Sequence, residues 1–245
     1  MRILRRCLAG VGVLLATAGC SSSLNIPPSL SRRVVVVPVE VQGPPFAETE
    51  IRFGDATAHD IRTTGIPTPN PPGGFIAEDH YGFSYALRFG ATELSAVDCE
   101  AGFGFTDAPP RTPTGPDVET LTSSAVKIQL ACNIRPLVAD GRGGHLLLKS
   151  REGLFNLAPE VTVSGDLDLT ADVQNAGVSV TRGWTTTVGV DFSLAGTSVA
   201  LLDLRASPSL RASQRLSAQA RASLASLVPA FVLYAPYERL RMRSN

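Results

Sequence analysis

The feature that most constrains the fold is a strict alternation of side chains between positions 81 and 90. Every second residue there is apolar and large, and the residues between them are small or polar. Successive side chains of a β-strand point to opposite faces, so this alternation predicts a strand with one buried face. The apolar positions are Tyr81, Phe83, Tyr85, Leu87 and Phe89.

The same alternation returns further along the chain, which predicts a mainly β protein. Residues 97–105 and 126–134 each place five apolar or cysteine residues on one face. Residues 34–41 are rich in valine, and Pro38 favours an edge position for that strand. Residues 161–173 are predicted as one long strand that pairs with a returning strand over residues 178–194 in an antiparallel hairpin.

One helix is predicted near the C-terminus. Ser207 and Pro208 have the character of a helix cap followed by a first-turn proline, and Pro229 is expected to end the helix. Alternation over residues 239–243 then predicts a final edge strand. The expected fold class is an antiparallel β-sandwich, or a strongly curved sheet, with one C-terminal α-helix.

The N-terminus has the layout of an export signal. A basic segment, residues 1–6, precedes an uncharged apolar stretch over residues 8–18. This stretch is shorter than the roughly 20 apolar residues that a membrane-spanning helix needs, and its pattern is typical of a secretory signal. It ends in Ala18, Gly19 and Cys20, which resembles the lipobox of bacterial lipoproteins.

The resemblance implies cleavage before Cys20 and attachment of acyl chains such as palmitate to that cysteine. Several chains would anchor the protein stably in a membrane. Ser21 lacks the acidic side chain that retains such proteins at the inner membrane, so the resemblance implies the outer membrane, on its periplasmic or surface face. An ordinary secretory cleavage site is the alternative reading of these residues.

These observations divide the chain into three expected parts. Residues 1–19 form the lipoprotein signal peptide. Residues 20–33, rich in serine and proline, form a flexible tether. Residues 34–245 form a single β-rich periplasmic domain.

Two cysteines in the predicted domain suggest a disulfide. Cys99 and Cys132 each lie on the apolar face of an alternating strand, so both side chains should point inward. An oxidising compartment favours a bond between them, which in the chain-entropy model contributes about 3–4 kcal/mol. Two free buried thiols are the alternative.

Charge and motifs argue against several functions. The neutral chain becomes acidic by about three charges once Arg2, Arg5 and Arg6 are removed, which disfavours nucleic-acid binding. No motif of a hydrolase, a phosphate-binding loop or a metal site is present, so we expect no enzyme activity, no metal and no cofactor. The three histidines are expected to be solvated residues of loops: His59, His80 and His145.

Two functions remain as hypotheses. The first is a lipid-anchored envelope protein with a non-enzymatic structural or partner-binding accessory role, attached to the membrane through Cys20 and bound to another envelope protein. The second is a carrier of an apolar small molecule or lipid, enclosed between the predicted hairpin and the helix. A filled core would leave no room for such a ligand.

Overall fold

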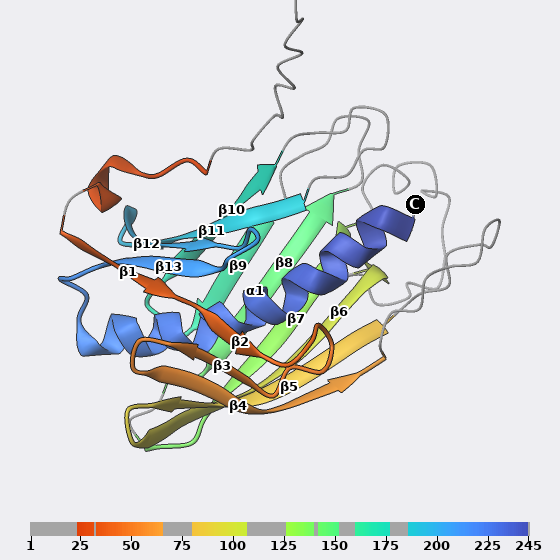
Figure 1. The fold of residues 1–245 in the computed structure, drawn as a ribbon, viewed down its shortest axis with the longest axis horizontal. Coiled ribbons are helices and arrows are strands. Elements are labelled where there is room, and N and C mark those ends of the chain that lie inside the picture. The colour runs from red at the N-terminus through yellow and green to blue at the C-terminus, as the bar shows by residue number, and fades with distance from the viewer. Residues whose placement is uncertain are drawn as a thin grey trace, which may run out of the picture.

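In the described part of the chain, two antiparallel sheets enclose one C-terminal α-helix (Figure 1), which confirms the predicted fold class. The structure is a computed structural model. It describes residues 24–31, 33–65, 80–106, 126–139, 142–151, 160–176 and 186–244.

The larger sheet has eight strands, and each strand pairs with the next one along the chain. The strands are β2 (Glu40–Gln42), β3 (Glu50–Phe53), β4 (Ala56–Thr64), β5 (His80–Phe89), β6 (Thr92–Thr106), β7 (Val126–Pro136), β8 (Gly144–Arg151) and β9 (Glu160–Gly165). This simple antiparallel order explains the clear alternation in β5, β6 and β7, because one face of each of these strands is turned to the core.

The smaller sheet has five strands, and it pairs the first strand of the described chain with the last one. Its first edge strand is β1, which confirms the edge position expected from Pro38, but the predicted strand over residues 34–41 divides at Val39 and continues as β2 at the edge of the larger sheet. In sheet order the strands are β1 (Val34–Pro38), β13 (Ser209–Ser213), β12 (Thr197–Asp203), β11 (Thr186–Leu194) and β10 (Thr170–Ala176).

Helix α1 (Ala218–Ser244) lies between the sheets and fills the space that they enclose. Phe231 packs edge-on against Phe192 of the smaller sheet, with ring centroids 6.0 Å apart. Tyr237 stacks on Tyr81 of the larger sheet at 5.3 Å. Every residue from 223 to 235 is buried, as expected for a helix that is covered on all sides.

The predicted helix boundaries are wrong. Ser207 and Pro208 precede strand β13, and the helix begins at residue 218 and continues through Pro229 and Pro236 to residue 244. A proline inside a helix removes one backbone hydrogen bond and displaces a carbonyl. The Tyr85 hydroxyl donates to the Ser226 carbonyl, 2.7 Å away, in the turn before Pro229. The axis of α1 changes direction partway along its length (Figure 1).

The helix also replaces the predicted final strand over residues 239–243. Burial between two sheets explains how the helix continues through Pro229, since tertiary packing outweighs the local preference of proline to end a helix.

The predicted long strand over residues 161–173 is two strands in different sheets. The break follows Gly165, whose φ of 90° is open to glycine but strained for other residues. Val163 and Leu169 both face the interior, so the alternation continues across the break. The pattern therefore predicted one strand, although the chain passes here from one sheet to the other. The return strand is confirmed where it is described, as β11 paired with β10.

The predicted tether is also corrected in part. Residues 24–31 lie on the outer face of the smaller sheet and contain the short helix η1 (Pro28–Leu30). Leu30 is fully buried there, so this stretch is packed rather than free. The rest of the predicted tether up to residue 23, with the signal peptide and Cys20, lies outside the described residues.

Candidate functional site

The disulfide predicted from the alternation is present. Cys99 of β6 and Cys132 of β7 are directly paired in the sheet, with Cα atoms 4.0 Å apart. Both side chains are buried on the face that α1 covers. The bond therefore fastens two central strands of the larger sheet to each other.

On the opposite face, above the same strands, lies a groove of about 560 Å³. Two neighbouring rows of outward side chains form it, and each row crosses five strands from β4 to β8. One row is Thr64, Gly82, Glu100, Ala131 and Leu147. The other row is Arg62, Ser84, Asp98, Asn133 and His145.

Small side chains create the floor of this groove. Gly82, Ser84 and Ala131 stand where longer side chains would fill the space. Gly82 also makes room for the Thr64 side chain of β4, because a Cβ atom at position 82 would lie 2.5 Å from the Thr64 hydroxyl oxygen. The sequence thus makes a hollow by placing short side chains at outward positions of adjacent strands.

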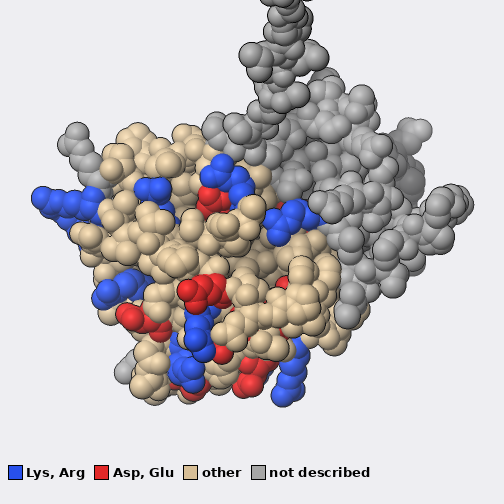
Figure 2. Space-filling view, viewed as in Figure 1, with Lys and Arg blue, Asp and Glu red and all other residues tan. Residues whose placement is uncertain are grey.

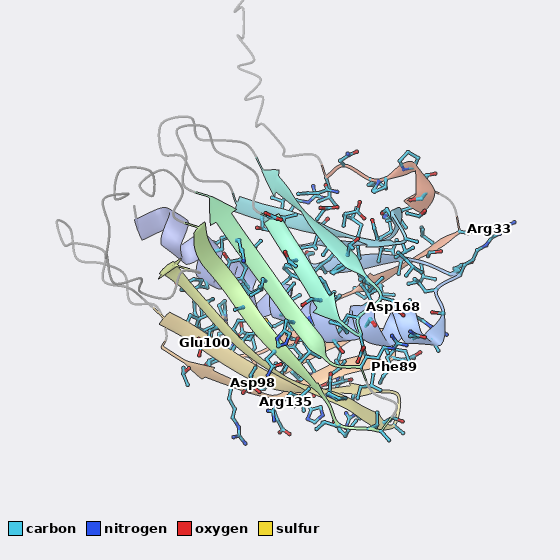
Figure 3. All side chains as sticks on the ribbon, turned by 180° about the vertical axis from the view of Figure 1, so that it is seen from behind. Arg33, Phe89, Asp98, Glu100, Arg135 and Asp168 are labelled. Atoms are coloured by element: carbon cyan, nitrogen blue, oxygen red, sulfur yellow. A yellow bond between two sulfur atoms is a disulfide. The ribbon has the colours of Figure 1, made fainter. Side chains whose placement is uncertain are left out.

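The walls of the groove carry both charges. Asp98 and Glu100 are exposed acids, and Arg62 and His145 come from the two outer strands of the rows. Asp98 accepts a hydrogen bond from Arg135 at 2.7 Å, an exposed pair that contributes about 0–1 kcal/mol. Figure 3 views this face and labels Asp98, Glu100 and Arg135.

Among the described residues, the side of the molecule shown in Figure 2 carries both charges. Figure 2 shows basic and acidic side chains interspersed among uncharged ones over the view that contains α1. The described part of that side therefore presents no extended basic surface.

The expected loop histidines lie instead on strands. His59 of β4 is placed between two carboxylates, with Nδ1 3.2 Å from Asp60 and Nε2 3.1 Å from Glu93. His145 of β8 is exposed and lines the groove. His80 begins β5, and its side chain lies outside the described residues. Within the described ranges, no group of three or more His, Cys, Asp or Glu side chains could hold a metal ion.

A second, smaller cleft of about 300 Å³ opens between the larger sheet and the first half of α1. Its apolar wall is formed by Leu94, Val138, Leu167 and Ala222. Three buried serines also face it, and the hydroxyl of one, Ser223, lacks a hydrogen-bond partner among the described residues. At its rim, Arg142 lies 3.2 Å from Asp168.

The second half of α1 carries a buried carboxylate, that of Glu238. Burial raises the pKa of Glu238 to about 7. Its two oxygens accept hydrogen bonds from the backbone N–H and the hydroxyl of Thr187, each 2.9 Å long. These bonds join the helix to the start of β11. Sequence reasoning missed this contact, because no local pattern relates residues 51 positions apart.

Sequence reasoning also missed the groove, although its signal was present. The outward positions of the alternating strands hold glycine, alanine, serine and charged residues, and register decides which of them become neighbours. Cys20 lies outside the described residues, so the structure does not place the expected lipidation site.

Comparison with known proteins gives no relative for this chain. No family model, no curated protein and no solved structure matches it. Among the described helical residues, no stretch is long and apolar enough to cross a membrane.

Proposed function

We propose that this chain is a lipid-anchored lipoprotein of the bacterial outer membrane that binds a protein partner through the groove on its larger sheet. It acts as a non-enzymatic accessory protein. Acyl chains on Cys20 fix it to the membrane, and the two rows of outward side chains provide the binding surface.

The anchor is supported by the N-terminal pattern and by the disulfide. The apolar stretch ends in small residues before Cys20, as in the lipobox of bacterial lipoproteins. The Cys99–Cys132 bond suits an oxidising compartment such as the bacterial periplasm. Ser21 favours the outer membrane.

The observation that carries the binding role is the groove of about 560 Å³ over the disulfide-linked strands. Within the described residues, α1 is buried against both sheets and occupies the space between them. Binding on the outer face leaves the core undisturbed, and the disulfide below holds the central strands in fixed register.

The chemistry of the groove favours a polar polypeptide over a lipid. Pockets for small apolar ligands are lined mainly by hydrophobic and aromatic side chains. Here Leu147 is the one large apolar side chain in the two rows, whereas the other members of the rows include two acids, an arginine and two hydroxyl side chains. Mixed charges of this kind give specificity for a partner of complementary charge.

The test is affinity capture from the protein's own membranes in mild detergent. Ala131→Trp places an indole in the middle of the groove, and Glu100→Arg reverses one wall charge without adding bulk to the floor. Gln214→Trp is the matched control, since Gln214 is exposed in a turn after β13, away from the groove.

We expect one protein to be retained by the wild type and by Gln214→Trp, and to be reduced at least tenfold with both groove variants. Equal capture of that protein by all four chains would refute the groove as the binding site. A chain that retains no protein would contradict the accessory role itself.

The small cleft beside α1 supports one second candidate, the carrier of an apolar molecule. Its volume of about 300 Å³ is at the lower limit of typical ligand pockets, which run from roughly 300 to 1,000 Å³. Native mass spectrometry separates the two functions. A small molecule retained by the wild type and lost in Ala222→Phe, which would fill the cleft, would favour the carrier.

A further inference from the structure

We infer that the docked segment, residues 24–31, holds the outer face of the smaller sheet against the phospholipid headgroups and keeps the groove away from the membrane. The inference rests on the proposed anchor at Cys20. It adds an orientation that the anchor alone does not dictate, since a free tether would let the domain turn in any direction.

The segment is fixed to the sheet by specific contacts. The side-chain amide of Gln174 accepts from the Asn25 N–H at 2.9 Å and donates to the Asn25 carbonyl at 2.8 Å. The Ser29 hydroxyl donates to the Ser198 carbonyl at 2.8 Å. Leu30 of η1 is fully buried, and η1 contacts β12 and β13.

Contact with the sheet begins as early as Leu24. A Cβ atom at Gly189 would lie 2.6 Å from the Leu24 side chain, so Leu24 packs directly over the backbone of β11. Glycine at position 189 is what permits this approach. The docked stretch therefore starts only four positions after Cys20.

This docking shortens the reach of the anchor. An extended chain spans at most about 3.5 Å per residue, so Cys20 must lie within about 14 Å of Leu24. A free tether over residues 20–33 would have allowed about 45 Å. With the thioether of Cys20 at the headgroup level, the smaller sheet must stay close to the bilayer.

The chemistry of this face suits headgroups near the edge strand β1. Val36 and Ile26 are exposed apolar side chains there, and Arg211 lies beside Val36 in the neighbouring strand. A basic residue near an anionic membrane contributes about 1 kcal/mol. Asp172 and Asp191 lie at the far edge, on β10 and β11, so the attraction is confined to the β1 side.

The groove lies on a different side of the protein. Helix α1 separates the two sheets, and the groove is on the face of the larger sheet that points away from this helix. In Figure 3, Arg33, just after the docked segment, is at the opposite end of the view from Asp98 and Glu100. An anchor held at the smaller sheet thus leaves the groove open to a partner.

Energy transfer to the membrane surface tests this orientation. The acylated protein is purified in detergent and reconstituted into vesicles of phosphatidylethanolamine and phosphatidylglycerol with a rhodamine headgroup acceptor. One donor dye is attached through Thr197→Cys, next to the docked segment, and in a second sample through Asn133→Cys, in the groove. Both positions are exposed.

We expect transfer from position 197 to be at least twice that from position 133. An insertion of 15 glycine and serine residues between Ser23 and Leu24 should bring the two values together. Equal or reversed transfer in the uninserted protein, with acyl chains verified by mass, would overturn the orientation and leave the anchor standing. An intact mass without acyl chains would remove the anchor and the orientation together.

Discussion

Gln174 binds the backbone of Asn25 through both ends of its side-chain amide, across 149 positions of sequence. The side-chain amide has one acceptor oxygen and an N–H donor, so it can pair with both the N–H and the carbonyl of Asn25, as the backbone of a neighbouring strand would. This contact turns a segment that composition marks as a linker into part of the folded domain.

Replacing Gln174 with alanine should release this segment locally. Each net hydrogen bond contributes about 0.5–1.5 kcal/mol, so the two bonds together amount to about 1–3 kcal/mol. Amide hydrogen exchange of Asn25 should rise by at least fivefold, with little change in the midpoint of global unfolding. Gln214→Ala, in an exposed turn, is the control and should leave this exchange rate unchanged.

Two tyrosines of β5 make a matched pair for testing the helix contact. The Tyr85 hydroxyl donates to the Ser226 carbonyl at 2.7 Å, whereas the buried Tyr81 hydroxyl has no hydrogen-bond partner among the described residues. Tyr85→Phe should cost about 1–3 kcal/mol, because the buried carbonyl loses its donor. Tyr81→Phe should be neutral or stabilising. Urea unfolding of both variants measures the difference, and equal costs would contradict it.

Glu238 should make stability depend on pH. Its folded-state pKa, raised by burial to about 7 from the ordinary 4.5, means that the folded protein holds this proton more tightly than the unfolded chain. The contribution is fully present below about pH 4.5 and is lost as the pH rises to 7. One pKa unit corresponds to about 1.4 kcal/mol, so the loss is roughly 3 kcal/mol.

Glu238→Gln removes this titration and keeps an acceptor for the Thr187 N–H. Relative to the wild type, this variant should gain roughly 3 kcal/mol between pH 4.5 and pH 8, as measured by urea unfolding at each pH. Glu100→Gln removes an exposed carboxylate and serves as the control. A constant difference between Glu238→Gln and the wild type across this range would show that Glu238 does not titrate there.

The Cys99–Cys132 bond should stabilise both the fold and the groove. For a sequence separation of 33 residues, its loss should cost about 3–4 kcal/mol in the chain-entropy model. The double variant Cys99→Ala, Cys132→Ala avoids a free thiol, and thermal unfolding measures the cost. Capture of the partner should weaken in parallel, because the groove lies above these two strands. Unchanged stability would show that the bond does not constrain the unfolded chain.

Alternation predicted the central strands β5, β6 and β7 of the larger sheet well, because each has one face on the core and one on solvent. Residues 81–89 show this most clearly, and the inward direction of Cys99 and Cys132 followed from the same pattern. Local patterns were sufficient there because neighbouring strands are also neighbours in sequence.

The C-terminal region could not be predicted from local patterns, because its structure depends on distant partners. Helix α1 tolerates Pro229 inside a core formed by both sheets, and strand β13 forms where the distant strand β1 can pair with it, as Val36 does with Arg211. The two rows of the groove likewise depend on the register of five strands. No single segment contains that information.

The most direct test of the account is the intact mass of the protein extracted in mild detergent from its own membranes. We predict a chain that begins at Cys20, carries two or three acyl chains on that residue, and lacks the two hydrogens lost in the Cys99–Cys132 bond. A chain cleaved elsewhere, or one with an unmodified Cys20, would contradict the membrane anchor on which the proposed function depends.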